Sequence, residues 1–261
     1  MLLNVKKYHR PTALNEAVAL LRLPATPAAI IAGGTELAGR TDSRLEAVVD
    51  LSRLGLAGIT VSGGRITIGA MTTLKELETD PAIRGLASGL LGRAAHLSAP
   101  ATIRAAATLG GTLAGEKGGV EIPTVLLALD AKVTLATPGA VTLEIAEFLA
   151  QGRHLLTGAI LTHVTIPVAE GARGGLARVS RSPADLSIAF AAAVLAGDEV
   201  RVALGGVSPC PRLLTDPANV PGEISAWDLM SDLRGSAEYR SWIAPVLVNR
   251  ALEDATGGTL V

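Results

Sequence analysis

Two loops with paired glycines are the segments of this chain best suited to bind an anion. The first, at 32–37, reads Ala-Gly-Gly-Thr-Glu-Leu and follows a short apolar run; the second, at 108–114, reads Thr-Leu-Gly-Gly-Thr-Leu-Ala. Adjacent glycines let successive backbone N–H groups converge on one point, and a neighbouring threonine hydroxyl adds a donor, which suits phosphate oxygens. A single Gly-Gly-Thr loop is more often a tight turn, and five other glycine pairs occur in the chain.

Other chemical motifs are absent from the sequence. There is no Walker loop, no G-x-G-x-x-G after a strand and no G-x-S-x-G turn. The four histidines are scattered without the spacing of metal ligands, and the single cysteine, Cys210, excludes an internal disulfide framework, a zinc finger and a self-contained iron–sulfur site. The residues alone indicate an α/β protein with two anion-binding loops and name no reaction.

Composition narrows the class of protein further. The 261 residues include 23 Lys and Arg against 24 Asp and Glu and only two each of Phe, Trp and Tyr, which argues against nucleic-acid partners. Mean hydropathy is +0.42, but the longest apolar stretches, at 188–197 and 123–129, are shorter than the ~20 residues of a membrane span. No apolar segment follows Lys6 and Lys7, unlike in a secretory signal. We therefore expect a cytoplasmic protein without a membrane span.

The pattern of apolar residues and turn residues predicts the elements that position these loops. In the first half we expect a helix with Thr12 as its cap that ends before Pro24, followed by buried strands at 28–32 and 47–51. We then expect a hairpin of 59–62 and 65–68. Two helices follow: one is capped by Thr72 or Thr73 and stops at Pro81, and the other covers 84–97. In the second half we expect helix at 125–129, strands at 132–135, 141–143, 162–167 and 200–204, and helix over 225–252. The polar stretch 170–175 is predicted to be a flexible boundary between lobes.

Nine segments in order along almost the whole chain resemble the FAD-binding medium subunit of molybdenum hydroxylases, the xanthine dehydrogenase and carbon monoxide dehydrogenase family. They are IIAGGTEL (30–37), VVDLSRL (48–54), ITIGAMTTLKELETDP (66–81), IRAAATLGGTLA (103–114), LLALDAKVTL (126–135), EFLAQG (147–152), RSPADLSIA (181–189), RVALGGVSPCPR (201–212) and YRSWIAPVLVNRAL (239–252). Each segment is a weak signal alone; their shared order makes the resemblance specific.

The resemblance implies an α+β fold of the PCMH type, in which two α/β subdomains bind FAD and a C-terminal α/β lobe carries a small antiparallel sheet. The implied domains are 1–169, with subdomains of about 1–55 and 56–169, and 175–261. The first glycine loop would wrap the FAD pyrophosphate, the second would reach it from the other subdomain, and two further residues would contact the cofactor. The implied cofactor-binding residues are Ala32, Gly33, Gly34, Thr35, Glu36, Leu37, Thr108, Gly110, Gly111, Thr112, Glu121 and Leu161.

The resemblance also implies a function and partners. Such a chain is the flavin subunit of a heterotrimeric oxidoreductase, with a [2Fe–2S] iron–sulfur subunit and a molybdopterin-binding large subunit as partners. Electrons from the clusters would pass through FAD to NAD, oxygen or a quinone, and this chain would supply no acid–base residue for substrate oxidation.

Several positions depart from the family pattern. Ala105 and Thr112 stand where relatives usually carry Asn, the segment Gly115–Glu121 replaces a run like Asn-Ala-Ser-Pro followed by Asp, Arg178 is the nearest basic residue to an expected lysine, and aromatic residues are missing around Leu186 and Ser187. These departures favour, as an alternative, a non-catalytic member with an eroded flavin site that acts as an assembly or docking scaffold. A free-standing flavoenzyme is a third hypothesis, although the acid–base residues it needs are not evident.

Overall fold

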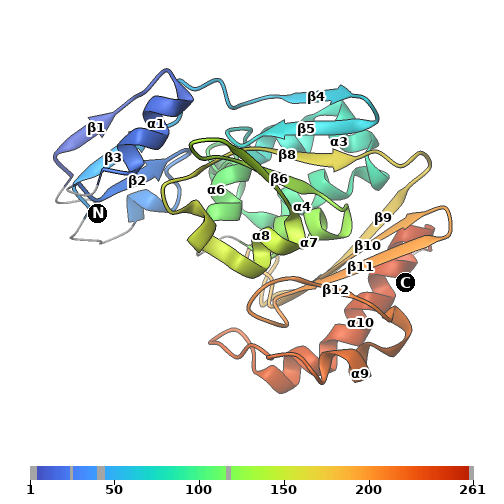
Figure 1. The fold of residues 1–261 in the computed structure, drawn as a ribbon. Coiled ribbons are helices and arrows are strands. Elements are labelled where there is room, and N and C mark those ends of the chain that lie inside the picture. The colour runs from blue at the N-terminus through green and yellow to red at the C-terminus, as the bar shows by residue number, and fades with distance from the viewer. Residues whose placement is uncertain (1–4, 24–25, 40–44, 116–118, 259–261) are drawn as a thin grey trace.

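A three-stranded parallel sheet begins the chain in the computed structural model, which describes residues 5–23, 26–39, 45–115 and 119–258 (Figure 1). Its strands are β1 (Lys7–His9), β2 (Ala28–Ile31) and β3 (Ala47–Asp50), in the order β1-β3-β2. Helix α1 (Leu14–Leu21) packs on the sheet, and every residue of β3 is buried. Because parallel strands end at the same edge, the first glycine loop leaves the sheet where β3 also ends.

The second sheet has five antiparallel strands in the order β4-β5-β8-β6-β7. The strands are β4 (Ile59–Ser62), β5 (Arg65–Gly69), β6 (Lys132–Ala136), β7 (Ala140–Glu144) and β8 (Ile160–Pro167). The predicted hairpin is confirmed as β4 and β5, with Gly63 and Gly64 both at positive φ, as a two-residue hairpin turn requires. The strands predicted at 132–135, 141–143 and 162–167 are confirmed as β6, β7 and β8.

Helices inserted between β5 and β6 carry the second glycine loop. They are α2 (Leu74–Thr79), α3 (Pro81–Gly85), α4 (Leu90–Ser98), α5 (Ala101–Arg104), α6 (Leu109–Ala114) and α7 (Glu121–Ala128), and α8 (Ile145–Gln151) follows β7. The prediction of a loop at 108–114 was wrong in form, because Gly110 and Gly111 lie in the first turn of α6 and Thr108 is the N-cap of this helix. Below, the second glycine loop denotes this helix start at 108–114. Short 3-10 turns complete the chain at η1 (Leu37–Gly39), η2 (Ala87–Gly89), η3 (Gly152–Leu156) and η4 (Pro217–Asn219). Thr73 caps α2 in a reciprocal capping box with Glu76, and α2 ends just before Pro81, as predicted.

The C-terminal sheet has four antiparallel strands, covered by the long helix α10 (Ala237–Thr256) (Figure 1). The strands are β9 (Arg173–Val179), β10 (Ala189–Ala196), β11 (Glu199–Gly205) and β12 (Arg212–Leu214), and α9 (Val220–Ile224) follows them. Alternate residues of β10 enter two different cores: Phe190, Ala192 and Val194 pack with the helices and central sheet, while the intervening alanines pack with α10. Since both faces of β10 are covered, its Ala-rich run is uniformly apolar.

Three helix predictions were wrong in their limits. The residue before α1 is Ala13, without a side-chain cap, so Thr12 does not cap this helix. The helix expected over 84–97 is broken, because Ala87 and Ser88 adopt positive φ and α4 starts only at Leu90. The helix expected over 225–252 begins at Ala237, with Ser236 as its cap.

The stretch 170–175 was wrongly predicted to be flexible throughout, since Arg173 begins strand β9. Gly174 and Gly175 lie in this strand where a side chain has no room: an added Cβ would overlap the carbonyl oxygens of Ala87 and Ala251, respectively. The glycines therefore serve the close approach of β9 to η2 and α10. The division into lobes at 169–175 stays a prediction. Among the described helices, none is long and apolar enough to cross a membrane.

Candidate functional site

A cleft of about 770 Å³ lies between the first sheet, the second glycine loop and the segment before β10. Every predicted site residue except Glu121 lines it. Its volume falls within the roughly 300–1,000 Å³ typical of small-molecule sites. The fold thus brings two loops separated by more than seventy positions in the sequence to one cavity.

The first glycine loop contacts the chain on both sides of the second glycine loop. Gly33 lies so close to the 103–107 segment that an added Cβ would overlap the carbonyl oxygen of Ala106. Farther along, a Cβ added at Gly115 would overlap the carboxylate of Glu36. Only a residue without a side chain allows this approach at Gly33, which explains why the first loop carries glycine there.

The loops differ in the backbone donors that they leave for a ligand. In the described part of the chain, the N–H groups of Gly34 and Thr35 donate to no protein acceptor. In the second loop, Gly110 donates to the Ala70 carbonyl at 2.8 Å and Gly111 donates to Thr108 Oγ1 at 3.1 Å. The first loop therefore offers free donors to an anion, whereas the second loop is braced by its own protein contacts.

The hydrogen-bond donors of the cleft suit an anionic ligand that is bound by main-chain N–H groups. Among the described residues that line the cleft there is no Lys or Arg, so an anionic ligand would depend on the first loop. Thr35 and Thr112 add hydroxyl donors at the lining, and neither hydroxyl has a protein partner within the described ranges. Leu161, which is 5% exposed, gives the cleft an apolar wall together with Met71 and Leu74. This combination fits a ligand that joins a diphosphate to an apolar ring system.

Glu121 lies behind the lining of the cleft. Its side chain is fully buried, and its Oε1 accepts hydrogen bonds from the Ser187 hydroxyl at 2.5 Å and the Ser187 N–H at 3.3 Å. The other oxygen, Oε2, has no hydrogen-bond partner among the described residues and faces Gly119, which lines the cleft. A contact between Glu121 and a ligand stays a prediction. The neighbouring departures at Glu116–Gly118 lie outside the described residues.

Arg178, named above as the nearest basic residue, holds a loop and does not line the cleft. Its guanidinium donates to the carbonyl oxygens of Leu97, Ser182, Pro183 and Asp185. Those bonds fix the segment that carries Leu186, which does line the cleft.

Sequence reasoning missed several residues of the cleft. They lie in helix ends and connecting segments to which the sequence assigned no ligand contact, and include Ser98, Pro100, Ile103, Leu156, Gly158 and Asp185. The helix and strand pattern gives no signal for them, because their place in the cleft depends on tertiary packing alone.

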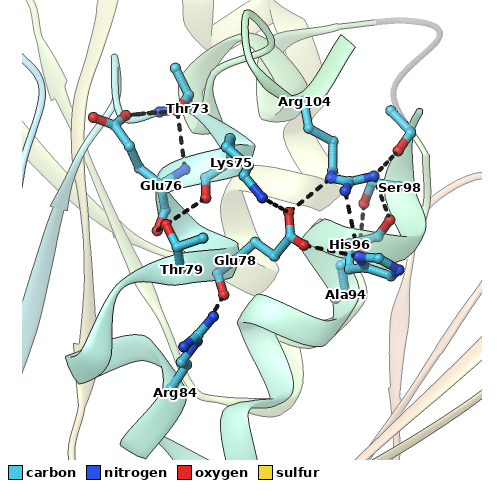
Figure 2. A network of polar contacts seen from close by, with 11 residues as sticks. Thr73, Lys75, Glu76, Glu78, Thr79, Arg84, Ala94, His96, Ser98 and Arg104 are labelled. Carbon is cyan, nitrogen blue, oxygen red and sulfur yellow. Dashed lines mark hydrogen bonds and ion pairs between the residues drawn. The ribbon is translucent and has the colours of Figure 1, made fainter. Parts of the chain in front are cut away.

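A polar network lies beside the cleft, between α2, α4 and α5 (Figure 2). Glu78 Oε1 contacts His96 Nδ1 at 3.0 Å, and Glu78 Oε2 accepts from Lys75 Nζ at 3.3 Å and from Arg104 Nε at 3.1 Å. The hydrogen bond from His96 lowers the pKa of Glu78 to about 2; partial burial opposes this shift, and the bonds from Lys75 and Arg104 add to it. Glu78 is therefore ionised over the whole physiological range.

This shift predicts a pH dependence of stability. Because the pKa of Glu78 falls from 4.5 in the unfolded chain to about 2 in the folded one, its contribution is fully present above pH 4.5 and is lost as the pH falls towards 2. Glu78→Gln should flatten the fall in the free energy of unfolding over this window, as measured by urea unfolding at several pH values. Curves of wild type and variant that stay parallel between pH 4.5 and 2 would contradict this assignment.

Comparison with known proteins assigns the chain that forms this cleft to a family. Its geometry defines a small-molecule-binding protein, with free main-chain donors on one side of the cleft and an apolar, leucine-rich wall on the other. Residues 3–169 match the family described as the FAD binding domain in molybdopterin dehydrogenase. The chain belongs to this family, the FAD-binding medium subunits of molybdenum hydroxylases, and its cofactor is FAD.

Individual relatives cover nearly the full chain. The carbon monoxide dehydrogenase medium chain of Hydrogenophaga pseudoflava is 29% identical over 95% of this chain and 96% of its own. The 6-hydroxypseudooxynicotine dehydrogenase complex subunit alpha of Paenarthrobacter nicotinovorans is 32% identical over 93% and 92%. In a solved structure of carbon monoxide dehydrogenase from Hydrogenophaga pseudoflava, the matching chain is 26% identical, with a TM-score of 0.88 and full coverage of both chains. The predicted family and α+β fold are confirmed, and the chain is an oxidoreductase subunit.

Proposed function

We propose that this chain is the electron-transfer subunit of a molybdenum hydroxylase, with FAD held in the cleft between the two glycine loops. The observation that carries the proposal is the contact of Gly33 with the 103–107 segment, which brings both loops to one cavity. FAD supplies the chemistry, because it exchanges one or two electrons and so links one-electron carriers to two-electron acceptors.

Each part of the cleft would have a separate role in holding the cofactor. The free N–H groups of Gly34 and Thr35 would bind the diphosphate, and the Thr112 hydroxyl would add a donor from the other side. Leu161 would pack against the flavin ring and exclude water from it. We propose 1–169 as the FAD-binding part and 175–261 as the lobe that closes the cleft through residues 184–186.

Partner subunits follow from the chemistry that this chain cannot supply. A [2Fe–2S] cluster needs four protein ligands, usually cysteines, and the chain has one cysteine. We propose an iron–sulfur subunit as electron donor and a molybdopterin-binding large subunit where substrate is oxidised, with NAD, oxygen or a quinone as the final acceptor. The names of the relatives, a medium chain and a complex subunit, support a multi-subunit assembly.

A scaffold without FAD is the second candidate. It is favoured by the second loop, whose N–H groups at Gly110 and Gly111 are already bonded within the protein. It predicts a complex that assembles and oxidises substrate but gains nothing from added FAD.

The complex purified through a tag on this chain tests the proposal. Its clusters are reduced with dithionite, and their reoxidation by NAD, oxygen or a quinone is followed by absorbance, with and without bound FAD. We expect the complex without FAD to be reoxidised by its best acceptor at least about tenfold more slowly, a difference of about 1.4 kcal/mol in barrier. Equal reoxidation rates with and without FAD would contradict the proposal that electrons leave the complex through FAD, and would favour a scaffold role for this chain.

A further inference from the structure

Arg104 connects the walls of the cleft through one buried guanidinium. The side chain is 8% exposed, and it stands at the end of α5, directly before the 105–107 segment that contacts Gly33. Its Nη1 donates to the carbonyl oxygens of His96 at 3.1 Å and Ala99 at 2.6 Å, while its Nε donates to Glu78 (Figure 2). One side chain therefore joins α2, the end of α4 and α5.

The groups that Arg104 holds are next to lining residues. One side of the cleft is lined by the turn of Ser98, Ala99 and Pro100. The carbonyl oxygen of Ala99 accepts a hydrogen bond from Arg104. On the other side, Ile103 lines the cleft, and the carbonyl of Ala107 accepts from the Leu74 N–H at 2.9 Å. The guanidinium thus fixes the turn at 98–100 relative to the segment that leads into the second glycine loop.

Glu78 orients this guanidinium. Its Oε2 accepts from Arg104 Nε, and charge-assisted bonds of this kind are stronger than bonds between neutral groups. The other partners of Glu78, Lys75 and His96, are 49% and 61% exposed, so water screens them far more than Arg104. Arg104 is the buried member of the network, and Glu78, 19% exposed, is its half-buried partner.

We infer that Arg104, oriented by Glu78, is a positioning residue for FAD: it sets the spacing between the 98–100 turn and the second glycine loop, and hence the shape of the cofactor cleft. The inference rests on the proposed function and deepens it. Lysine at this position keeps the charge but has a single nitrogen, which cannot reach Glu78 and two carbonyl groups in the planar arrangement of a guanidinium.

Arg104→Lys and a matched control test the inference. Arg201 also donates to two backbone carbonyls, of Leu127 and Ala128, and to a carboxylate, Asp130, but it does not line or border the cleft. The full chain is titrated with FAD, with the dissociation constant, the visible circular dichroism of bound flavin and the melting temperature of the FAD-free chain as readouts. We expect Arg104→Lys to raise the dissociation constant about tenfold and to change the flavin dichroism, and Arg201→Lys to change the dissociation constant less than about twofold.

The outcomes separate the inference from the proposed function. Wild type that binds no FAD would overturn both. Wild type that binds FAD while Arg104→Lys binds it equally, with unchanged dichroism, would overturn only the positioning role. So would an equal loss in Arg201→Lys, because a general loss of stability would then explain both variants. If Arg104→Lys fails to fold, Glu78→Gln carries the test: weaker FAD binding supports the role of the pair, and unchanged binding overturns it.

Discussion

Gly33→Ala should weaken FAD binding by about 100-fold or more, which is about 2.7 kcal/mol. The alanine Cβ atom would overlap the carbonyl oxygen of Ala106, so the first glycine loop and the 103–107 segment must separate to accept it. Gly33 itself is exposed at the cleft, and the strand before it keeps its pairing with β3, so the chain should still fold. FAD titration by flavin fluorescence measures the loss, and far-ultraviolet circular dichroism reports the fold.

A matched substitution elsewhere controls for the general cost of replacing glycine. Gly139 lies in the turn between β6 and β7, and an added Cβ there meets no described atom within 4 Å. Gly139→Ala should leave FAD binding within about twofold of wild type. Gly111→Val should have a smaller effect than Gly33→Val, because a Cβ at Gly111 meets only Thr108 Oγ1, at 2.9 Å. If Gly33→Ala retained FAD like wild type, the contact between Gly33 and the 103–107 segment would have no role in binding.

Arg240→Ala should lower the free energy of unfolding by about 3 kcal/mol, because it leaves two buried carbonyl groups without a donor, each at a cost of about 1–3 kcal/mol. The Arg240 side chain is fully buried, contacts the carbonyls of Ile188 and Gly206, and pairs with Asp232 at 2.6 Å. Without the guanidinium, these acceptors lose their donor inside the C-terminal lobe. Because Ile188 follows Leu186 of the cleft, FAD binding should weaken as well.

Arg250 provides the control on the same helix. It is exposed, so Arg250→Ala should stay within about 0.5 kcal/mol of wild type in urea unfolding. Equal stability of Arg240→Ala and Arg250→Ala would show that the buried network does not hold the lobe together.

Elements defined by local signals were predicted well. Strands β2 and β3 are short apolar runs, and the β4–β5 hairpin has two strands that alternate around a glycine pair. Thr73 and Glu76 have the spacing of a capping box, which places the start of α2. In each case the residues that determine the structure lie within a few positions of one another.

Features defined by distant contacts could not be predicted. Ala87 and Ser88 have no local reason to leave the helical region; the break between α3 and α4 lies where η2 meets β9, and the Gly174 N–H donates to Ser88 Oγ at 3.3 Å. Gly174 and Gly175 suggest a linker, yet they serve close packing in a strand. The two glycine-pair segments were identified because their composition is local, although the second is the start of helix α6 and not a loop. The 98–100 and 156–158 segments of the cleft carry no motif.

Hydrogen–deuterium exchange of the purified chain, with and without FAD, tests most directly whether one cofactor lies between both loops. We predict slower exchange on addition of FAD in peptides that cover 32–37 and in peptides that cover 98–112, since both segments line the same cleft. Unchanged exchange in either segment, or protection confined to another part of the chain, would contradict the account.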